Sequence, residues 1–172
     1  SDWSSDVCSS DLLFNNVGSN GNIGIGFNAL YTNNGPNYLV AIGYTALQSN
    51  TTGLYNTAIG YQGLTFNITG SYNVAVGHQA LKTNSSGTQN VALGYNALQN
   101  NSTGTDNIGI GTYALYSMDT GQNNICIGTA TMNGGTTETD NVAIGYLAMN
   151  AGFVSKCVAV GSQDRKSTRL NS

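Results

Sequence analysis

Apolar and small residues alternate in short blocks that recur along the chain, as in Val74-Ala75-Val76-Gly77. An alternation with a period of two puts Val74 and Val76 on one face of an extended strand and the two small residues on the other. No stretch keeps the i, i+3, i+4 apolar spacing of an amphipathic helix. The pattern therefore predicts an all-β chain with one such strand in every repeat.

Each block ends on a glycine, and these marker glycines recur at a nearly constant distance. They are Gly26, Gly43, Gly60, Gly77, Gly94, Gly111, Gly128, Gly145 and Gly161, and the spacing between neighbours is 17 seven times and 16 once. A period this short is typical of a solenoid in which each repeat forms one coil. We therefore expect a parallel β-solenoid of about nine 17-residue coils over residues 13–163.

The other positions of the repeat form columns as well. Asparagine precedes the marker glycine by four residues at Asn22, Asn56, Asn73, Asn90, Asn107, Asn124 and Asn141. An Ala-Leu pair and a polar turn follow the glycine. We expect two short parallel strands per coil, joined by two turns whose backbone groups are satisfied by the asparagines. The Ile/Val and Leu columns would fill a thin interior, and the Ala/Gly face would be bare.

One thin coil buries little apolar surface, so packing another chain against the bare face would add to the stability. Ala75 and Gly77 would then permit close approach between chains, and the hypothesis that follows is a homotrimer. The structural positions of the repeat on which this fold depends are Asn56, Asn73, Asn90, Asn107, Gly60, Gly77, Gly94 and Gly111.

The tandem N-[VI]-A-[IV]-G blocks, continued by an aromatic residue, Ala-Leu and a turn such as Asn50-Thr51-Thr52-Gly53, resemble a known family. They are similar to the head repeats of trimeric autotransporter adhesins (the YadA-like head) and to related repeats of phage tail fibres. The resemblance covers residues 22–161, with a longer period than is typical of those heads. It implies a left-handed parallel β-roll of three chains, displayed on a bacterial outer surface or a phage tail fibre and used for attachment.

Both ends differ from the repeats in composition. Residues 164–172 can be back-translated so that the reverse complement encodes Ser4 to Asp11, and both strings resemble a translated sequencing adapter. We therefore expect residues 1–12 and 164–172 to be foreign to the fold and treat residues 13–163 as the solenoid domain. That domain retains two basic residues, Lys82 and Lys156, and four acidic ones.

This near-neutral composition excludes several partners. Charged residues are 8% of the whole chain, which carries a net charge of −3, and the repeats hold no basic patch for phosphate backbones or anionic lipid. We expect no nucleic-acid partner and no membrane contact from this segment. No P-loop, paired catalytic carboxylates, nucleophile–base set or metal-ligand set is recognisable, so we expect no enzyme activity, cofactor or metal.

An aromatic residue follows the marker glycine in six repeats: Phe27, Tyr44, Tyr61, His78, Tyr95 and Tyr146. One interpretation is a ladder that contacts a ligand, with rings stacking on sugars. The other is a purely structural ladder that stiffens the stack of coils. His78 has no nearby carboxylate column or nucleophile for catalysis and is interpreted as a replacement for tyrosine.

Three further features have structural explanations. Cys126 and Cys157 lie nearly two coils apart, beyond disulfide reach, and are expected to be free thiols. Asparagines in N-x-S/T, namely Asn50, Asn67, Asn84 and Asn101, are expected to form turns rather than carry glycans. Ice binding is suggested by a column of hydroxyl residues, namely Thr52, Thr69, Ser86, Thr103 and Thr120. Glu138 and Asp140 suggest a bound cation, although an irregular loop accounts for this pair.

The sequence thus predicts a fibrous, non-enzymatic surface-attachment segment. Its partners would be further copies of itself and a host-surface protein or glycan, bound through repeated weak contacts. Two alternatives remain open: a monomeric solenoid that binds a repetitive ligand such as ice or a polysaccharide, and a pure structural spacer.

Overall fold

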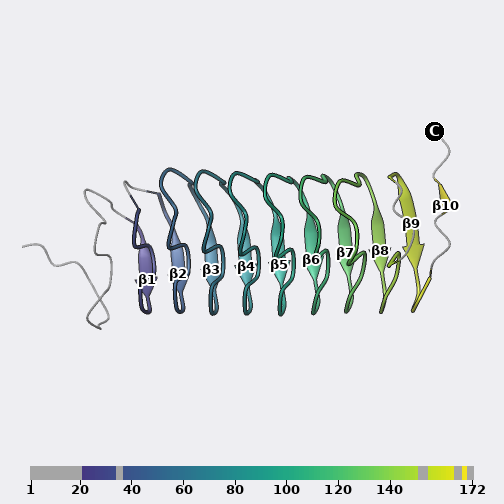
Figure 1. Ribbon diagram of the computed structural model, residues 1–172, viewed down its shortest axis with the longest axis horizontal. Helices are drawn as coiled ribbons and strands as arrows, with labels where there is room; N and C mark the ends of the chain where they lie inside the picture. Colours follow the sequence, from purple (N-terminus) through teal and green to yellow (C-terminus); the bar gives the residue numbers. More distant parts are fainter. Residues whose placement is uncertain (1–20, 34–36, 151–154, 165–167, 170–172) are drawn as a thin grey trace, which may run out of the picture.

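A computed structural model describes residues 21–33, 37–150, 155–164 and 168–169. They form nine parallel strands that stand side by side in chain order in one sheet, followed by a short antiparallel strand (Figure 1). The strands are β1 (Ile23–Ile25), β2 (Val40–Ile42), β3 (Thr57–Ile59), β4 (Val74–Val76), β5 (Val91–Leu93), β6 (Ile108–Ile110), β7 (Ile125–Ile127), β8 (Val142–Ile144), β9 (Cys157–Val160) and β10 (Thr168–Arg169). The predicted all-β solenoid is confirmed, with about eight turns.

The register of the sheet follows the repeat. Val74 pairs with Val91 and Ala75 with Ala92, so like residues stack on like along the rod. Val142 pairs with Val158, one residue short of the usual offset, where the repeat itself is one residue shorter. The spacing of the marker glycines is therefore the length of one coil.

Among the described residues each coil contains a single strand, so the expected second strand is wrong. After the marker glycine the backbone bends through left-handed residues, such as Gln79 (φ 55°) and Leu81 (φ 50°). The amide of Gln79 donates to the carbonyl of Tyr61 in the preceding coil at 2.8 Å, and that of Leu81 donates to Ala97 in the following coil at 3.0 Å. The backbone groups are thus satisfied between coils without a regular strand, although leucine rarely adopts this conformation.

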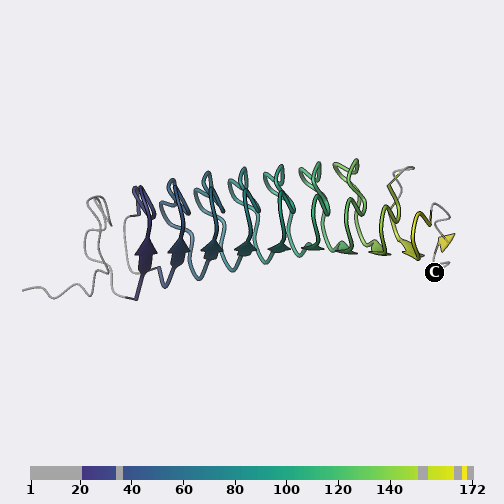
Figure 2. The same cartoon turned by 90° about the horizontal axis from the view of Figure 1, so that it is seen from below.

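The two sides of the rod consequently look different. In Figure 2 the strands lie along one side, and the looped segments that connect them project to the other side. The turn at the far side is tight, because left-handed residues follow two and four positions after marker glycines such as Gly77 and Gly94. This tightness leaves a thin interior.

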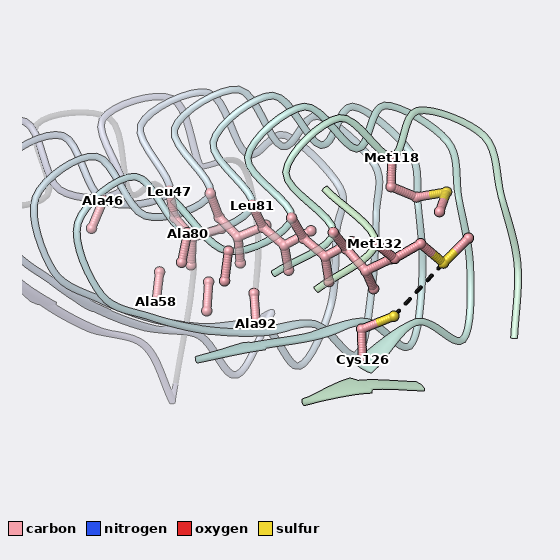
Figure 3. Close-up of a cluster of buried hydrophobic side chains, with 14 of the residues drawn as sticks. Ala46, Leu47, Ala58, Ala80, Leu81, Ala92, Met118, Cys126 and Met132 are labelled. Carbon is pink, nitrogen blue, oxygen red and sulfur yellow. Dashed lines mark hydrogen bonds between the residues drawn. The ribbon is translucent and has the colours of Figure 1, made fainter. Parts of the chain in front are cut away.

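The interior holds the small residues of the strands, which reverses the expected orientation. Ala58, Ala75 and Ala92 are fully buried and pack in one cluster with Leu81 and Leu98 from the turns. Figure 3 shows alanine and leucine side chains of this cluster in rows inside the coils. A thin coil has room for a methyl group opposite leucine but not for two rows of isoleucine or valine. The Ile/Val columns therefore face outward.

Close approach at the marker glycines occurs between coils of the same chain. Gly77 has φ +136°, and a Cβ at this position would collide with the carbonyl group of Gly94 in the next coil. The expectation that Ala75 and Gly77 form a bare face for another chain is therefore wrong. Both positions are instead required for the coils of one chain to stack.

Of the two terminal segments expected to be foreign, residues 1–12 lie outside the described residues. In the C-terminal segment, Thr168 pairs with Val158 and Arg169 with Cys157 in antiparallel register. Asp164 accepts a hydrogen bond from the amide of Met149 through its carbonyl oxygen, at 2.9 Å. These contacts place β10 at the C-terminal edge of the sheet.

Candidate interaction surface

The first and third residues of strands β1 to β8, with their equivalents in β9, form a broad outward surface, which we call the apolar sheet face. It consists of Ile23, Ile25, Val40, Ile42, Thr57, Ile59, Val74, Val76, Val91, Leu93, Ile108, Ile110, Ile125, Ile127, Val142, Ile144, Val158 and Val160, every one of them exposed or half-buried. The exposed fraction reaches 46% at Leu93 in the middle of the sheet. Polar or charged residues would be expected at these positions if the face met water permanently.

The size of this face is what separates it from ordinary surface. Nine three-residue strands about 10 Å long, spaced at about 4.8 Å, give on the order of 400 Å², and aromatic side chains along the borders add apolar area over β1 to β5. Contiguous apolar patches on monomeric proteins rarely exceed a few hundred Å². With these bordering rings the face approaches the area that one partner contributes to the smaller protein–protein interfaces.

An aromatic column lies along one border of the apolar sheet face, two residues after each strand. Ring centroids are 5.3 Å apart for Phe27–Tyr44, 5.2 Å for Tyr44–Tyr61, 5.0 Å for Tyr61–His78 and 4.9 Å for His78–Tyr95, and all four pairs are stacked. We call these five residues the trailing column. His78 therefore occupies a ring position in the stack.

Tyr146, the sixth aromatic residue of the predicted ladder, is separate from the other five. The two intervening coils have Thr112 and Thr129 in this column. Tyr95 instead meets Tyr113 edge-on, with ring centroids 5.4 Å apart and an interplanar angle of 75°. A side-chain hydrogen bond with Tyr95 raises the pKa of Tyr113. The stacked ladder thus ends at Tyr95.

A second stack of tyrosines, the leading column, lies along the opposite border, two residues before each strand. Tyr38–Tyr55 and Tyr55–Tyr72 are stacked with ring centroids 5.4 Å and 5.2 Å apart. The three side chains are 47–57% exposed. This column was missed at the level of sequence, although its tyrosines recur there with the same period as the marker glycines.

Two asparagine columns occupy the interior and carry the hydrogen bonding between coils. In the column that precedes each strand, Oδ1 of Asn56 accepts from the amide of Asn73 at 2.9 Å, and Nδ2 of Asn73 donates to the carbonyl of Gly87 at 2.9 Å. The same bonds recur at Asn90 and Asn107. The predicted role of this column in satisfying the turn backbone is confirmed.

The second column contains the asparagines of the N-x-S/T sequences. Nδ2 of Asn67 donates to Oδ1 of Asn50 at 2.8 Å, and Nδ2 of Asn84 donates to Oδ1 of Asn67 at 2.7 Å. Each amide also donates to the glycine carbonyl three residues later, as from Asn84 to Gly87 at 3.0 Å. These side chains are fully buried in the turn. The turn interpretation is confirmed, and a glycan has no access to these positions in the folded chain.

Of the chemical groups singled out in the sequence, the two thiols lie in the interior, whereas Asp140 lies at a border of the apolar sheet face, two residues before β8. Cys126 and Cys157 are free and buried, as expected. The Cys126 thiol contacts the Met132 sulfur at 3.8 Å (Figure 3), and burial raises its pKa to about 12. Glu138 Oε2 accepts from the amide of Thr137 at 2.9 Å, while Asp140 Oδ1 accepts from Asn123 at 3.1 Å. In the described part of the chain, no three metal-ligating side chains converge.

The remaining polar column lies on the turn side of the rod. Thr52, Thr69, Ser86, Thr103 and Thr120 are all exposed, and they form one row along the turns rather than a flat array on the sheet.

Compared with protein-family models, curated proteins and solved structures, the chain has no significant match. Among the residues that the structure describes, no helix is long and apolar enough to cross a bilayer. The interaction surface therefore has to be interpreted from its own geometry.

Proposed function

We propose that this chain is a non-enzymatic, fibrous attachment segment in which three copies assemble through their apolar sheet faces. The observation that supports the proposal is the exposed column of Ile, Val and Leu that runs along all nine strands. In the assembled rod each chain would form a left-handed β-roll, as the resemblance to adhesin heads and tail fibres implies. The assembly would project from a bacterial outer surface or belong to a phage tail fibre.

Self-association fits this face better than a small ligand does. Aliphatic residues stack at almost every coil, as with Val74 on Val91, and Thr57 is the one polar residue among them, so the face offers a ligand no cluster of polar groups. Burying apolar surface stabilises an assembly by about 25 cal/mol per Å². An area of several hundred Å² per copy is therefore sufficient to hold thin coils together.

Attachment would then use the opposite side of the rod. With the sheet faces inside, the turns point outward and present the row of Thr52, Thr69, Ser86, Thr103 and Thr120. Hydroxyl groups repeated at each coil can form many weak hydrogen bonds with a host-surface glycan or protein. Three rows on one rigid rod would add through effective concentration.

The trailing column is less suited to stacking on sugars. A sugar packs its C–H face on a ring face, whereas rings such as Tyr61 and His78 are stacked on their neighbours at 5.0 Å. Those rings mainly offer edges and hydroxyl groups to solvent. The ligand-contact interpretation of this ladder stays a prediction, and the geometry favours its structural alternative.

Mass measurement tests the proposal directly. Size-exclusion chromatography with light scattering should give about three times the 17.8 kDa of one chain. Some members of an immobilised panel of host glycans and matrix proteins should retain beads coated with the protein. Beads coated with a monomeric variant should not be retained. A monomeric wild-type chain would contradict the proposal, and thermal hysteresis in its solutions would then favour the ice-binding alternative.

A further inference from the structure

In most coils the two borders of the apolar sheet face carry residues of the same kind. Strand β3 has Tyr55 two residues before it and Tyr61 two residues after it, and the rings at both positions are exposed. Strands β2 and β4 follow the same rule, with the pairs Tyr38/Tyr44 and Tyr72/His78.

The two borders also match at strands whose border residues are polar. Strand β6 is flanked by Asp106 and Thr112, and strand β7 by Asn123 and Thr129. Aromatic residues thus face each other across strands β2 to β4, and polar residues do so across β6 and β7. Strands β5 and β8, which follow these two blocks, each have one polar and one aromatic border residue, and β1 has Gly21 on one border and Phe27 on the other.

Contact within one chain does not explain this match. The two border positions lie at opposite ends of a three-residue strand and of the bends that flank it, which keeps them more than about 10 Å apart. Each ring stacks along its own column, with centroids 5.2 Å apart for both Tyr44–Tyr61 and Tyr55–Tyr72, and the two columns do not stack on each other. A contact with a second chain would account for the matched composition.

We propose that the leading column of one copy packs against the trailing column of the next copy, forming an aromatic seam that fixes parallel, in-register assembly. The inference rests on the proposed self-association of the chain. When copies are related by a rotation axis along the rod, the leading border of each copy faces the trailing border of its neighbour. Tyr55 then meets Tyr61 of a second copy at the same height, and Tyr72 meets His78.

The chemistry of the two columns suits such a seam. Stacked rings expose their edges and hydroxyl groups, so two facing columns would bury apolar ring edges and let tyrosine hydroxyls form hydrogen bonds across the seam. An antiparallel arrangement would lose this gain. It would place the aromatic half of one rod beside Asp140 and Lys156 of the other, where charged groups would be desolvated without partners.

Engineered disulfides test the seam in the full chain. The background carries Cys8→Ser, Cys126→Ala and Cys157→Ala, which leaves no other thiol. In this background Tyr55→Cys is combined with Tyr61→Cys, and the pair is oxidised with diamide. The two sites are too far apart within one chain for a disulfide. We therefore expect covalent trimers on a non-reducing denaturing gel, with the far-ultraviolet spectrum of the parent.

Two control pairs report the alternatives. Tyr38→Cys with Tyr95→Cys joins borders that lie three coils apart, about 14 Å along the rod, and should stay uncrosslinked when the copies are in register. Tyr55→Cys with Asn123→Cys joins two leading borders and should crosslink only in an antiparallel arrangement centred on β5.

The outcomes separate the seam from the assembly itself. Trimeric mass together with no Tyr55→Cys/Tyr61→Cys product would overturn the seam and leave the proposed assembly standing. A crosslinked dimer of dimeric mass would keep the seam and remove the threefold arrangement. Crosslinking of the antiparallel pair would overturn the seam, and monomeric mass would overturn both the seam and the assembly.

Discussion

Oδ1 of Asn101 is buried without a hydrogen-bond partner among the described residues, and in the next coil Met118 occupies the asparagine position. In the preceding coils the same oxygen always accepts from the amide of the next asparagine, as Oδ1 of Asn84 does from Nδ2 of Asn101 at 2.7 Å. The buried amide ladder therefore has a defined end at Asn101, and its members differ in how many bonds they hold.

This difference predicts unequal effects of alanine substitution. Asn84→Ala removes three hydrogen bonds, to Asn67, to Gly87 and from Asn101, and leaves Oδ1 of Asn67 unsatisfied in the interior. Asn101→Ala removes two hydrogen bonds and leaves Oδ1 of Asn84 unsatisfied, but it also deletes an acceptor that has no partner among the described residues, so the number of unsatisfied buried acceptors does not rise. Since an unsatisfied buried group costs about 1–3 kcal/mol, we expect Asn84→Ala to lower the free energy of unfolding by at least about 1 kcal/mol more.

Urea unfolding followed by circular dichroism measures both variants. The two side chains are equally buried, so they serve as matched controls for lost packing. Equal losses for Asn84→Ala and Asn101→Ala would contradict the ladder as a chain of coupled hydrogen bonds.

The marker glycines and a neighbouring glycine offer a second comparison. Gly77 adopts φ +136° and faces the Gly94 carbonyl, so Gly77→Ala should destabilise the chain by more than about 2 kcal/mol through strain and collision. Gly63 lies in the interior, where an added Cβ would have ordinary clearance, its nearest contact being Cβ of Ala58 at 3.5 Å. Six other coils have alanine at that position.

Gly63→Ala is therefore expected to be neutral or to stabilise by up to about 1 kcal/mol, because alanine restricts the unfolded chain and adds a buried methyl group. Thermal unfolding of both variants provides the measurement. Destabilisation by Gly63→Ala comparable to that by Gly77→Ala would show that the coils tolerate no added methyl group at all.

The sequence predicted much of this architecture because its regularity is direct physical information. The constant spacing of the marker glycines specifies the coil length, and the alternation at Val74-Ala75-Val76 locates strand β4 at the right residues. The asparagine columns were recognisable because a repeated buried amide has few other uses than bonding to turn backbone. These inferences did not depend on how the coils pack in the folded chain.

The orientation of the faces was not predictable in the same way. Alternation separates Val76 from Ala75 but does not say which of them points inward. That depends on the thickness of the coil, which follows from left-handed residues such as Leu81, and leucine has no intrinsic preference for that conformation. The leading column containing Tyr55 was visible as a period but had no evident role until both strand borders were located.

A charged substitution on the apolar sheet face should dissociate the proposed trimer. Leu93 is 46% exposed at the centre of this face, so Leu93→Lys places a charge in the proposed interface while the coil of each copy stays unchanged. We expect the mass by light scattering to fall from three chains to one. Thr103→Lys adds the same charge on the turn side, where Thr103 is exposed, and should keep the trimeric mass. Loss of the trimer in both variants would place the interface elsewhere.

Burial of Cys126 predicts a specific loss of stability at alkaline pH. Its pKa rises from 9.0 to about 12 in the folded chain, because burial penalises the thiolate. The folded state therefore keeps the proton that the unfolded chain releases. The contribution of this group to stability is complete below pH 9 and is lost as the pH rises toward 12, at about 1.4 kcal/mol per pH unit.

Cys126→Ala isolates this effect from the titration of the tyrosines. Alanine occupies the same strand position in most of the other coils, as at Ala75 and Ala92, so the variant should fold with a normal interior. Urea unfolding at intervals from pH 8 to pH 11 should give a free energy of unfolding that falls more steeply with pH for the parent than for Cys126→Ala. Parallel pH profiles would mean that the thiol ionises as readily in the folded chain as in the unfolded one, and that the interior around Met132 admits water.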